Sequence, residues 1–166
     1  FLQQAINSRV PHLIVDRMEK PWVSRRLMAV SDQKITFEEG AVLEAKRGAF
    51  KDPYDTLIRI RSVTNVTFSG YGAEVRMWKV DYTNASLYAW SEWRHAFDVL
   101  SAANVTIEGF RVSGSGGDGV YLGEGRIAEP NVNVVLRDLD LVDNNRQAVS
   151  VITADGLLME RGKMRH

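Results

Sequence analysis

The strongest constraint on the fold is a six-residue motif that recurs at intervals too short for separate domains. It is clearest from Asn65 to Gly70 (NVTFSG) and from Asn104 to Gly109 (NVTIEG). Five copies, 31, 39, 29 and 23 residues apart, begin at Lys34, Asn65, Asn104, Asn133 and Gly156. Intervals of roughly 20 to 50 residues indicate stacked units, each too small to bury its own apolar face. The uneven spacing predicts a coil whose strands keep their length while a corner loop accepts insertions.

Short strands separated by turns account for most of the remaining chain. Residues 1–8 carry apolar Leu2, Ala5 and Ile6 at helical spacing, which predicts a short helix stopped by Pro11. Residues 18–26 show no periodicity, and no long helix is expected after residue 10. Alternation of β-branched or aromatic with polar residues predicts strands at 12–15, 27–30, 34–37, 41–45, 56–60, 65–68, 74–78, 96–100, 104–107, 110–112, 120–122, 133–136, 139–142, 148–152 and 156–160.

The same alternation predicts which side chains face inward. Apolar residues stand seven and five positions before three of the motif copies, as Ile58 and Ile60, Phe97 and Val99, and Val149 and Val151. The residue between each pair is polar: Arg59, Asp98 or Ser150. A period of two places one row in the core and the next in solvent. After an insertion at 123–130 is allowed for, Val120 and Leu122 take the inward places and Tyr121 the outward one.

The first residue of the motif lies where the chain should turn a corner. Asn65, Asn104 and Asn133 occupy this place, and Asn tolerates the left-handed backbone conformation better than most residues. Identical side chains stacked on successive coils could hydrogen-bond to one another. The sequence therefore assigns these asparagines a structural role.

Composition limits the classes of partner. The chain has 166 residues, 45% of them apolar, a formal net charge of zero and no cysteine. It offers neither disulfides nor thiolate metal ligands, and no electrostatic reason to bind nucleic acid or an anionic membrane. No apolar run approaches the roughly 20 residues of a membrane helix, and the first residues lack the pattern of a signal peptide. We expect an extracellular or periplasmic protein whose signal peptide is not in this chain.

Three stretches carry a resemblance to a known family: residues 104–110 (NVTIEGF), 117–123 (GDGVYLG) and 143–152 (DNNRQAVSVI). They resemble right-handed parallel β-helix proteins of the pectin-lyase-like superfamily, and the resemblance covers residues 1–166. It implies one all-β domain, a single-stranded solenoid of about four to five coils, with a short N-terminal capping helix and an insertion loop at 80–94. Since such solenoids usually have more coils, the resemblance also implies a fragment truncated at the C-terminus.

The register of the repeats predicts a column of polar side chains. Nine residues before the motif stand Thr56, His95 and Gln147, and Asp118 takes the same place in the coil with the insertion. Paired strands lie about 4.8 Å apart, so we expect these side chains to stack on successive coils. Arg94 and Arg146 precede two of them and should flank the column.

Candidate ligand-binding residues gather around this column. Aromatic faces, carboxylates and arginine forks together suit hydroxyl-rich and acidic sugars. We therefore expect Asp118, His95 and Arg146 to be catalytic. The expected substrate-binding residues are Arg94, Trp93, Trp90, Tyr121, Gln147 and Asp98.

Each of these residues also has a structural interpretation. Asp118, between two glycines, is suited to brace a turn, and His95 would then be its satisfied partner. Trp90 and Trp93 are suited to pack the insertion against the coil. Arg59 opposite Asp98 predicts a cross-strand ion pair, which contributes well under about 1 kcal/mol if it is exposed.

The resemblance implies a carbohydrate-active protein, with a polysaccharide or oligosaccharide bound along the coils. The superfamily contains lyases, epimerases and hydrolases, and also non-catalytic tailspikes and adhesins, so a polysaccharide lyase or glycoside hydrolase and a non-catalytic scaffold all stay open. Its polygalacturonase-type hydrolases combine an Asn-Thr-Asp run, a Gly-Asp-Asp run and a Gly-His-Gly, whereas this chain has only a single Gly-Asp-Gly, at 117–119. The sequence does not assign an oligomeric state.

Asp138, Asp140 and Asp143 form a second acidic group. Asp138 and Asp140 share strand parity, and oxygen ligands of this kind suit Ca²⁺. A Ca²⁺ site is therefore one interpretation, and solvated charges at a sheet edge are the other. No other cofactor is indicated.

Overall fold

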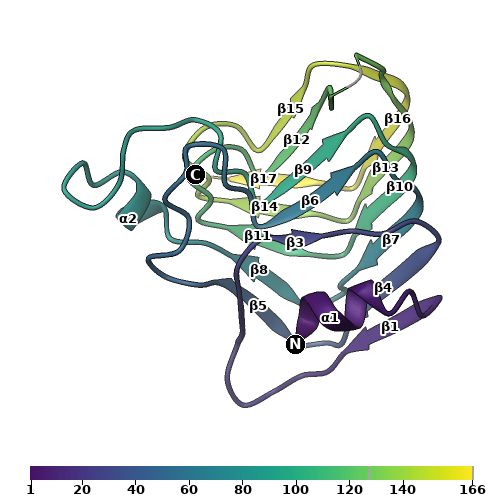
Figure 1. The fold of residues 1–166 in the computed structure, drawn as a ribbon, viewed down its shortest axis with the longest axis horizontal. Coiled ribbons are helices and arrows are strands. Elements are labelled where there is room, and N and C mark those ends of the chain that lie inside the picture. Colours follow the sequence, from purple (N-terminus) through teal and green to yellow (C-terminus); the bar gives the residue numbers. More distant parts are fainter. Residues whose placement is uncertain (127, 166) are drawn as a thin grey trace.

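The computed structural model describes residues 1–126 and 128–165. It confirms the predicted all-β fold: a right-handed parallel β-helix in which the chain passes through three parallel sheets in turn, coil upon coil (Figure 1). Among the described residues, five turns cross all three sheets and a sixth crosses two of them. The motif copies all lie in one of these sheets, which we call sheet A. The outward-facing row predicted from Arg59, Asp98 and Tyr121 lies in another, which we call sheet C.

The strands follow the order A, B, C in every turn. Sheet A contains β1 (His12–Val15), β4 (Gln33–Phe37), β7 (Thr64–Ser69), β10 (Ala103–Glu108), β13 (Asn131–Arg137) and β16 (Ala154–Glu160). Sheet B contains β2 (Trp22–Ser24), β5 (Val42–Ala45), β8 (Glu74–Arg76), β11 (Arg111–Ser113), β14 (Asp140–Val142) and β17 (Lys163–Arg165). Sheet C contains β3 (Leu27–Met28), β6 (Ile58–Arg61), β9 (Phe97–Leu100), β12 (Val120–Gly123) and β15 (Val149–Val151).

The predicted N-terminal helix is α1 (Leu2–Asn7), and it covers the first turn of the coil (Figure 1). Leu2 and Ile6 are its buried residues. Gln3 ties the helix to β3, because its side-chain amide donates to the Met28 carbonyl and accepts the Met28 N–H. No helix in the described part of the chain is long and apolar enough to span a membrane.

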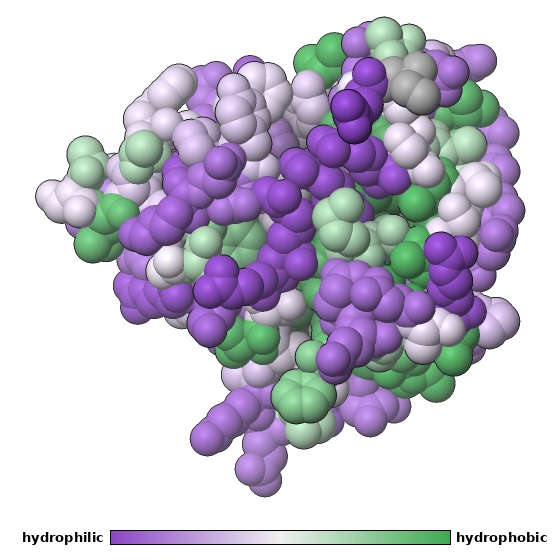
Figure 2. Space-filling view, in the orientation of Figure 1, coloured by the Kyte–Doolittle hydropathy of each residue, from purple (hydrophilic) through white to green (hydrophobic). Residues whose placement is uncertain are grey.

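The core is the column of inward side chains enclosed by the three sheets. The residues predicted to face inward in β6, β9 and β12 have no exposed surface, which confirms the period-two assignment for these strands. In β15 the expected burial is not found: Val149 is only partly buried and Val151 is 46% exposed, because β15 is the edge strand of sheet C. Phenylalanine rings meet in the core: the ring centroids of Phe37 and Phe110 are 5.3 Å apart, and those of Phe68 and Phe97 are 5.9 Å apart. Outside this core, hydrophilic residues cover much of the face seen in Figure 2, and hydrophobic residues show in several separate places.

The corner between sheets C and A is held by a ladder of asparagines. Asn65, Asn104 and Asn133 have φ values of 58°, 54° and 53°, in the left-handed region as the sequence predicted. Each Asn Nδ2 donates to the side-chain oxygen of the preceding turn. Asn133 donates to Asn104 at 3.2 Å, Asn104 to Asn65 at 3.0 Å, and Asn65 to Asp32 at 2.7 Å. Gly156 continues the row without a side chain.

The register of the first motif copy was predicted wrongly. Ile35 pairs with Phe68, and Lys34 pairs with Thr67, so Asp32 and not Lys34 lies opposite Asn65. A shift of two residues leaves every side chain on the same face of the strand, and alternation cannot detect it. The ladder hydrogen bond from Asn65 to Asp32 agrees with the observed register.

Three short elements were missed. β2 lies in the segment 18–26, β17 follows Gly162, and α2 (Lys79–Tyr82) lies in the insertion between β8 and β9. Each has only three or four residues, too few to show a periodicity. β2 is ordered by pairing with β5 and by the hydrogen bond from the Trp22 indole to the Asp16 carbonyl, at 2.8 Å.

Replacement of one ladder residue tests the corner. We expect Asn104→Ala to lower the free energy of unfolding by about 1–3 kcal/mol, because alanine strains the left-handed backbone and removes both ladder bonds. Asn104→Gly removes the same bonds but accepts the backbone conformation, so its loss should be smaller. Urea denaturation measures both variants. Equal stability of Asn104→Ala and the wild type would show that the ladder is dispensable.

Candidate functional site

A groove of about 240 Å³ lies on the outer face of sheet C. Its floor comes from β6, β9 and β12, and its sides come from the two insertions that flank these strands. The segment before β9 contributes Trp93, and the segment after β12 contributes Glu124. The residues that line the groove are Tyr54, Thr56, Arg59, Arg61, Trp93, His95, Asp98, Leu100, Tyr121 and Glu124.

The predicted column is present, and it precedes the strands of sheet C. The Leu57 N–H donates to the His95 carbonyl, the Ala96 N–H to the Asp118 carbonyl, and the Gly119 N–H to the Gln147 carbonyl. Side chains add further links. The Asp118 N–H donates to His95 Nδ1, and the Gln147 N–H donates to Asp118 Oδ1, both at 2.9 Å. Together these bonds join four consecutive coils.

Aromatic rings form one end of the groove. The His95 imidazole stacks on the Tyr121 ring, with centroids 4.6 Å apart and planes 2° from parallel. Trp93 stands edge-on to both, at 5.9 Å from His95 and 5.6 Å from Tyr121. Tyr54 lies beyond Trp93 at 6.1 Å and is largely exposed. This cluster presents aromatic surface to solvent at the rim and buries it at the floor.

The Arg59–Asp98 ion pair predicted from the sequence crosses the floor of the groove. Arg59 contacts Asp98 Oδ2 through Nε at 2.8 Å and Nη2 at 2.7 Å. The two side chains are only 11% and 3% exposed, so the pair is largely desolvated rather than a surface pair. Burial raises the pKa of Asp98, and the Arg59 guanidinium opposes that rise.

His95 is buried and neutral. Its Nδ1 accepts the Asp118 N–H, which assigns the ring proton to Nε2. Burial lowers the pKa of His95 to about 3, and the nearby positive charge of Arg146 acts in the same direction. The lone pair that a base would need is already engaged, so His95 is poorly placed to abstract a proton.

Asp118 lies behind His95 and not on the surface of the groove. It has no exposed surface, and its Oδ2 lies 3.5 Å from His95 Nδ1 and 3.9 Å from Arg146 Nη1. Burial raises its pKa, and the hydrogen bond from the Gln147 N–H opposes that rise. Its visible contacts fit the predicted turn brace.

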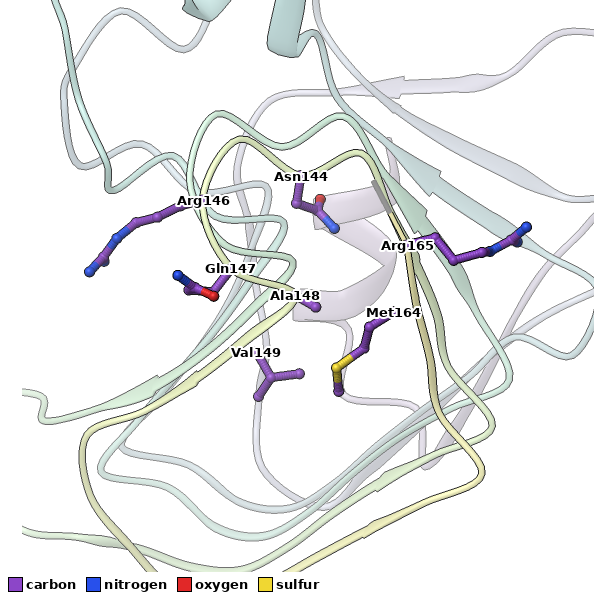
Figure 3. Close-up of a pocket in the computed structure, with 7 residues that line it drawn as sticks. All are labelled: Asn144, Arg146, Gln147, Ala148, Val149, Met164 and Arg165. Carbon is purple, nitrogen blue, oxygen red and sulfur yellow. The ribbon is translucent and has the colours of Figure 1, made fainter.

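Arg146 and Gln147 belong to the next coil. Both side chains point outward from it, whereas Asn144, Val149 and Met164 point into the coil interior (Figure 3). Arg146 also lies 3.8 Å from Glu92 of the insertion. The two residues therefore flank the groove but do not line it.

Arg94 and Trp90 lie away from the groove. Arg94 is fully buried, and its guanidinium donates to the carbonyls of Phe50 and Lys51. Its charge lies near the rings of Tyr82 and Tyr88, so it fastens the insertion to the segment before β6. Trp90 is 79% exposed on the insertion and does not line the groove. Adjacent residues of the insertion face different surroundings: Arg94 is buried, whereas Trp93 lines the groove. Spacing in the sequence does not reveal this difference.

Sequence reasoning had no ligand role for Tyr54, Arg61, Leu100 or Glu124, which also line the groove. Two of them could have been predicted from the outward row of sheet C. Arg61 and Leu100 lie two residues after Arg59 and Asp98 and pair with each other at the ends of β6 and β9. Tyr54 and Glu124 come from irregular segments, where no period connects them to the column.

The three aspartates considered for Ca²⁺ are each paired with basic side chains. Arg161 contacts Asp138 at 2.6 Å, Arg111 contacts Asp140 at 3.1 Å, and Lys79 contacts Asp143 at 2.6 Å. Within residues 1–126 and 128–165, no group of three or more acidic or histidine side chains could hold a metal ion. The three aspartates therefore form ion pairs with basic side chains of other coils.

Fold and site together define the chain as a right-handed parallel β-helix with an aromatic groove on one sheet. The chain is similar in structure to a putative glycosyl hydrolase from Parabacteroides merdae, with a TM-score of 0.72 and 18% identity over 97% of this chain and 75% of that one. At this identity the likeness establishes the fold alone. No family model and no curated protein matches the sequence, so membership of the pectin-lyase-like superfamily stays a prediction.

Removal of Arg59 tests the buried ion pair. We expect Arg59→Met to lower the free energy of unfolding by about 3–5 kcal/mol at neutral pH, because it leaves Asp98 buried without its partner. Asp98 then has a raised folded-state pKa, so the loss should be smaller in acid and grow as the pH rises. Arg161→Met removes a contact in which arginine is 58% exposed to solvent, so its loss of stability should be much smaller. Equal losses in the two variants would contradict the burial argument.

The pH dependence of stability tests the state of His95. A histidine whose folded pKa is lowered stabilises the fold above its unfolded pKa of about 6.5, and this contribution is lost as the pH falls. Between about pH 6 and pH 4.5, the wild type should lose about 1 kcal/mol per pH unit more than His95→Asn. Denaturation series in urea give these slopes, and an unchanged slope in His95→Asn would contradict a neutral His95.

Proposed function

We propose that the groove on sheet C binds a glycan. The aromatic cluster of Tyr54, Trp93, His95 and Tyr121 is the observation that carries the proposal. Carbon-bearing faces of sugar rings pack on such surfaces, while the hydroxyl groups need polar partners. Arg59, Arg61, Asp98 and Glu124 provide charged groups along the same groove. An open groove on the outside of the coil suits a chain molecule better than a small enclosed metabolite.

Hydrolysis of the bound glycan is the second candidate. Two carboxyl groups, Asp98 and Glu124, line the groove, and glycosidases use a pair of carboxyl groups. Burial raises the pKa of Asp98, which is the direction that a proton donor requires, and the Arg59 guanidinium opposes that rise. The similarity in fold to a putative glycosyl hydrolase is compatible with this reaction.

Proton abstraction by a lyase or an epimerase fits the geometry less well. The basic groups near the column that could abstract a proton are His95, Arg94 and Arg146. His95 Nδ1 is engaged by the Asp118 N–H, Arg94 is buried under the insertion, and Arg146 lies beside two carboxylates. A scaffold that binds a glycan without cleaving it needs none of these groups.

Substitution of the two tryptophans of the insertion tests the binding function. We expect Trp93→Ala to weaken binding about tenfold or more across a panel of neutral and acidic oligosaccharides, because it removes aromatic surface from the groove. Trp90→Ala is the matched control, since Trp90 is on the same insertion but outside the groove, and its affinity should equal that of the wild type. Isothermal titration calorimetry measures both. Failure of the wild type to bind any member of the panel would refute the proposal.

The same panel separates binding from hydrolysis. If hydrolysis occurs, new reducing ends appear, and Glu124→Gln abolishes them while the oligosaccharide still binds. Release of an unsaturated product, detected by its ultraviolet absorbance, would instead indicate a lyase. Binding without any product is the result expected of a scaffold.

A further inference from the structure

Three polar side chains at the floor of the groove are buried without complete hydrogen bonding. Thr56, His95 and Asp98 are 1%, 2% and 2% exposed, and all three line the groove. Thr56 Oγ1, His95 Nε2 and Asp98 Oδ1 each lack a hydrogen-bond partner. The Thr56 hydroxyl is close enough to Asp98 to lower its pKa, but the two do not form a well-aligned bond.

Such atoms are costly, and here they come together. A buried polar atom without a partner typically costs about 1–3 kcal/mol. Most buried polar groups in proteins are satisfied, so three exceptions that line one groove suggest a missing partner. The second polar atom of Asp98 and of His95 already has a partner: Asp98 Oδ2 accepts from Arg59, and His95 Nδ1 accepts from the Asp118 N–H.

The chemistry of the free atoms specifies that partner. His95 Nε2 carries the proton and can only donate, whereas the carboxylate oxygen Asp98 Oδ1 accepts. The Thr56 hydroxyl can do either. A hydroxyl group satisfies a donor and an acceptor at the same time; a carboxylate would be repelled by Asp98, and an apolar group would satisfy neither.

We propose that Thr56, His95 and Asp98 form a hydroxyl-binding subsite, in which His95 Nε2–H donates to one hydroxyl group of a bound glycan and Asp98 Oδ1 accepts from it. This inference rests on the proposed glycan-binding function. It assigns His95 the role of a specificity-determining donor in place of the catalytic role expected from the sequence. Because the imidazole stays neutral, the donor is present throughout the physiological pH range.

A ligand hydroxyl reaches the shielded atoms of the subsite only when a neighbouring side chain moves. Nε2 is shielded in the free groove, and the neighbouring Trp93 indole stands edge-on to the imidazole and is 37% exposed. Exposed side chains change rotamer in picoseconds to nanoseconds, so rotation of Trp93 does not limit binding.

Two replacements of His95 separate its two nitrogens. In His95→Asn, the amide oxygen stands close to the position of Nδ1 and can accept the Asp118 N–H, but the Nε2 donor is lost. In His95→Gln, the longer amide can reach the position of Nε2, but the bond from Asp118 is lost. We expect His95→Asn to fold and to bind oligosaccharide about tenfold more weakly, a loss typical of one hydrogen bond. His95→Gln should be less stable yet bind more tightly than His95→Asn.

The probes are methyl glycosides of glucose, galactose, mannose and galacturonic acid, together with the monodeoxy analogues of whichever binds. One deoxy analogue should bind the wild type about tenfold more weakly and lose no further affinity in His95→Asn. Imidazole ¹⁵N spectra should show the Nε2–H tautomer of His95, and its proton should shift when the parent glycoside binds. His12→Asn is the control and should leave affinity unchanged.

The outcomes distinguish the two proposals. If a glycoside binds and Trp93→Ala weakens it, but His95→Asn and every deoxy analogue bind as tightly as their parents, the subsite is refuted and the binding function stands. If no glycoside or oligosaccharide binds the wild type, both proposals fall.

Discussion

Parallel backbone pairing between successive coils is the interaction on which everything else in this structure depends. Once β6, β9, β12 and β15 pair in register, each side chain lies directly above its equivalent in the turn below. The core, the asparagine ladder and the polar column all result from this alignment. Each turn buries its apolar row only because neighbouring turns cover it, so the stability of any coil is shared with those on either side.

The corners determine where the chain can leave the coil without disturbing that pairing. The asparagine corner keeps nearly the same backbone conformation in three consecutive turns, with side chains bonded from turn to turn. The segment that leads from sheet B into sheet C varies in length from turn to turn. The insertion that contains α2 and Trp93 lies in this segment, before β9. A second insertion follows β12. These two insertions lie at opposite ends of the neighbouring strands β9 and β12, and they form the sides of the groove on the outer face.

The chemical properties of the groove depend on the burial of its charged and polar side chains. Arg59 and Asp98 on an open sheet would form an ordinary surface pair, but the insertions remove them from water and make each dependent on the other. His95 is similarly changed: a group that would titrate near neutral pH is held as a neutral donor by its desolvation and by the Asp118 N–H. The polar atoms left unpaired at the floor are part of the same desolvated cluster, and a ligand hydroxyl would complete it.

The sequence by itself determined the coil, the inward and outward rows, the left-handed asparagine corner and the alignment of Thr56, His95, Asp118 and Gln147, because all of these follow from periods of two residues and of one turn. It did not determine the register of the first copy, since a shift of two residues preserves alternation. Only the tertiary structure decided that Arg94 is buried while adjacent Trp93 lines the groove, and that Tyr54 and Glu124 join it. These side chains come from irregular insertions, whose directions depend on packing against the coil and not on any repeating pattern.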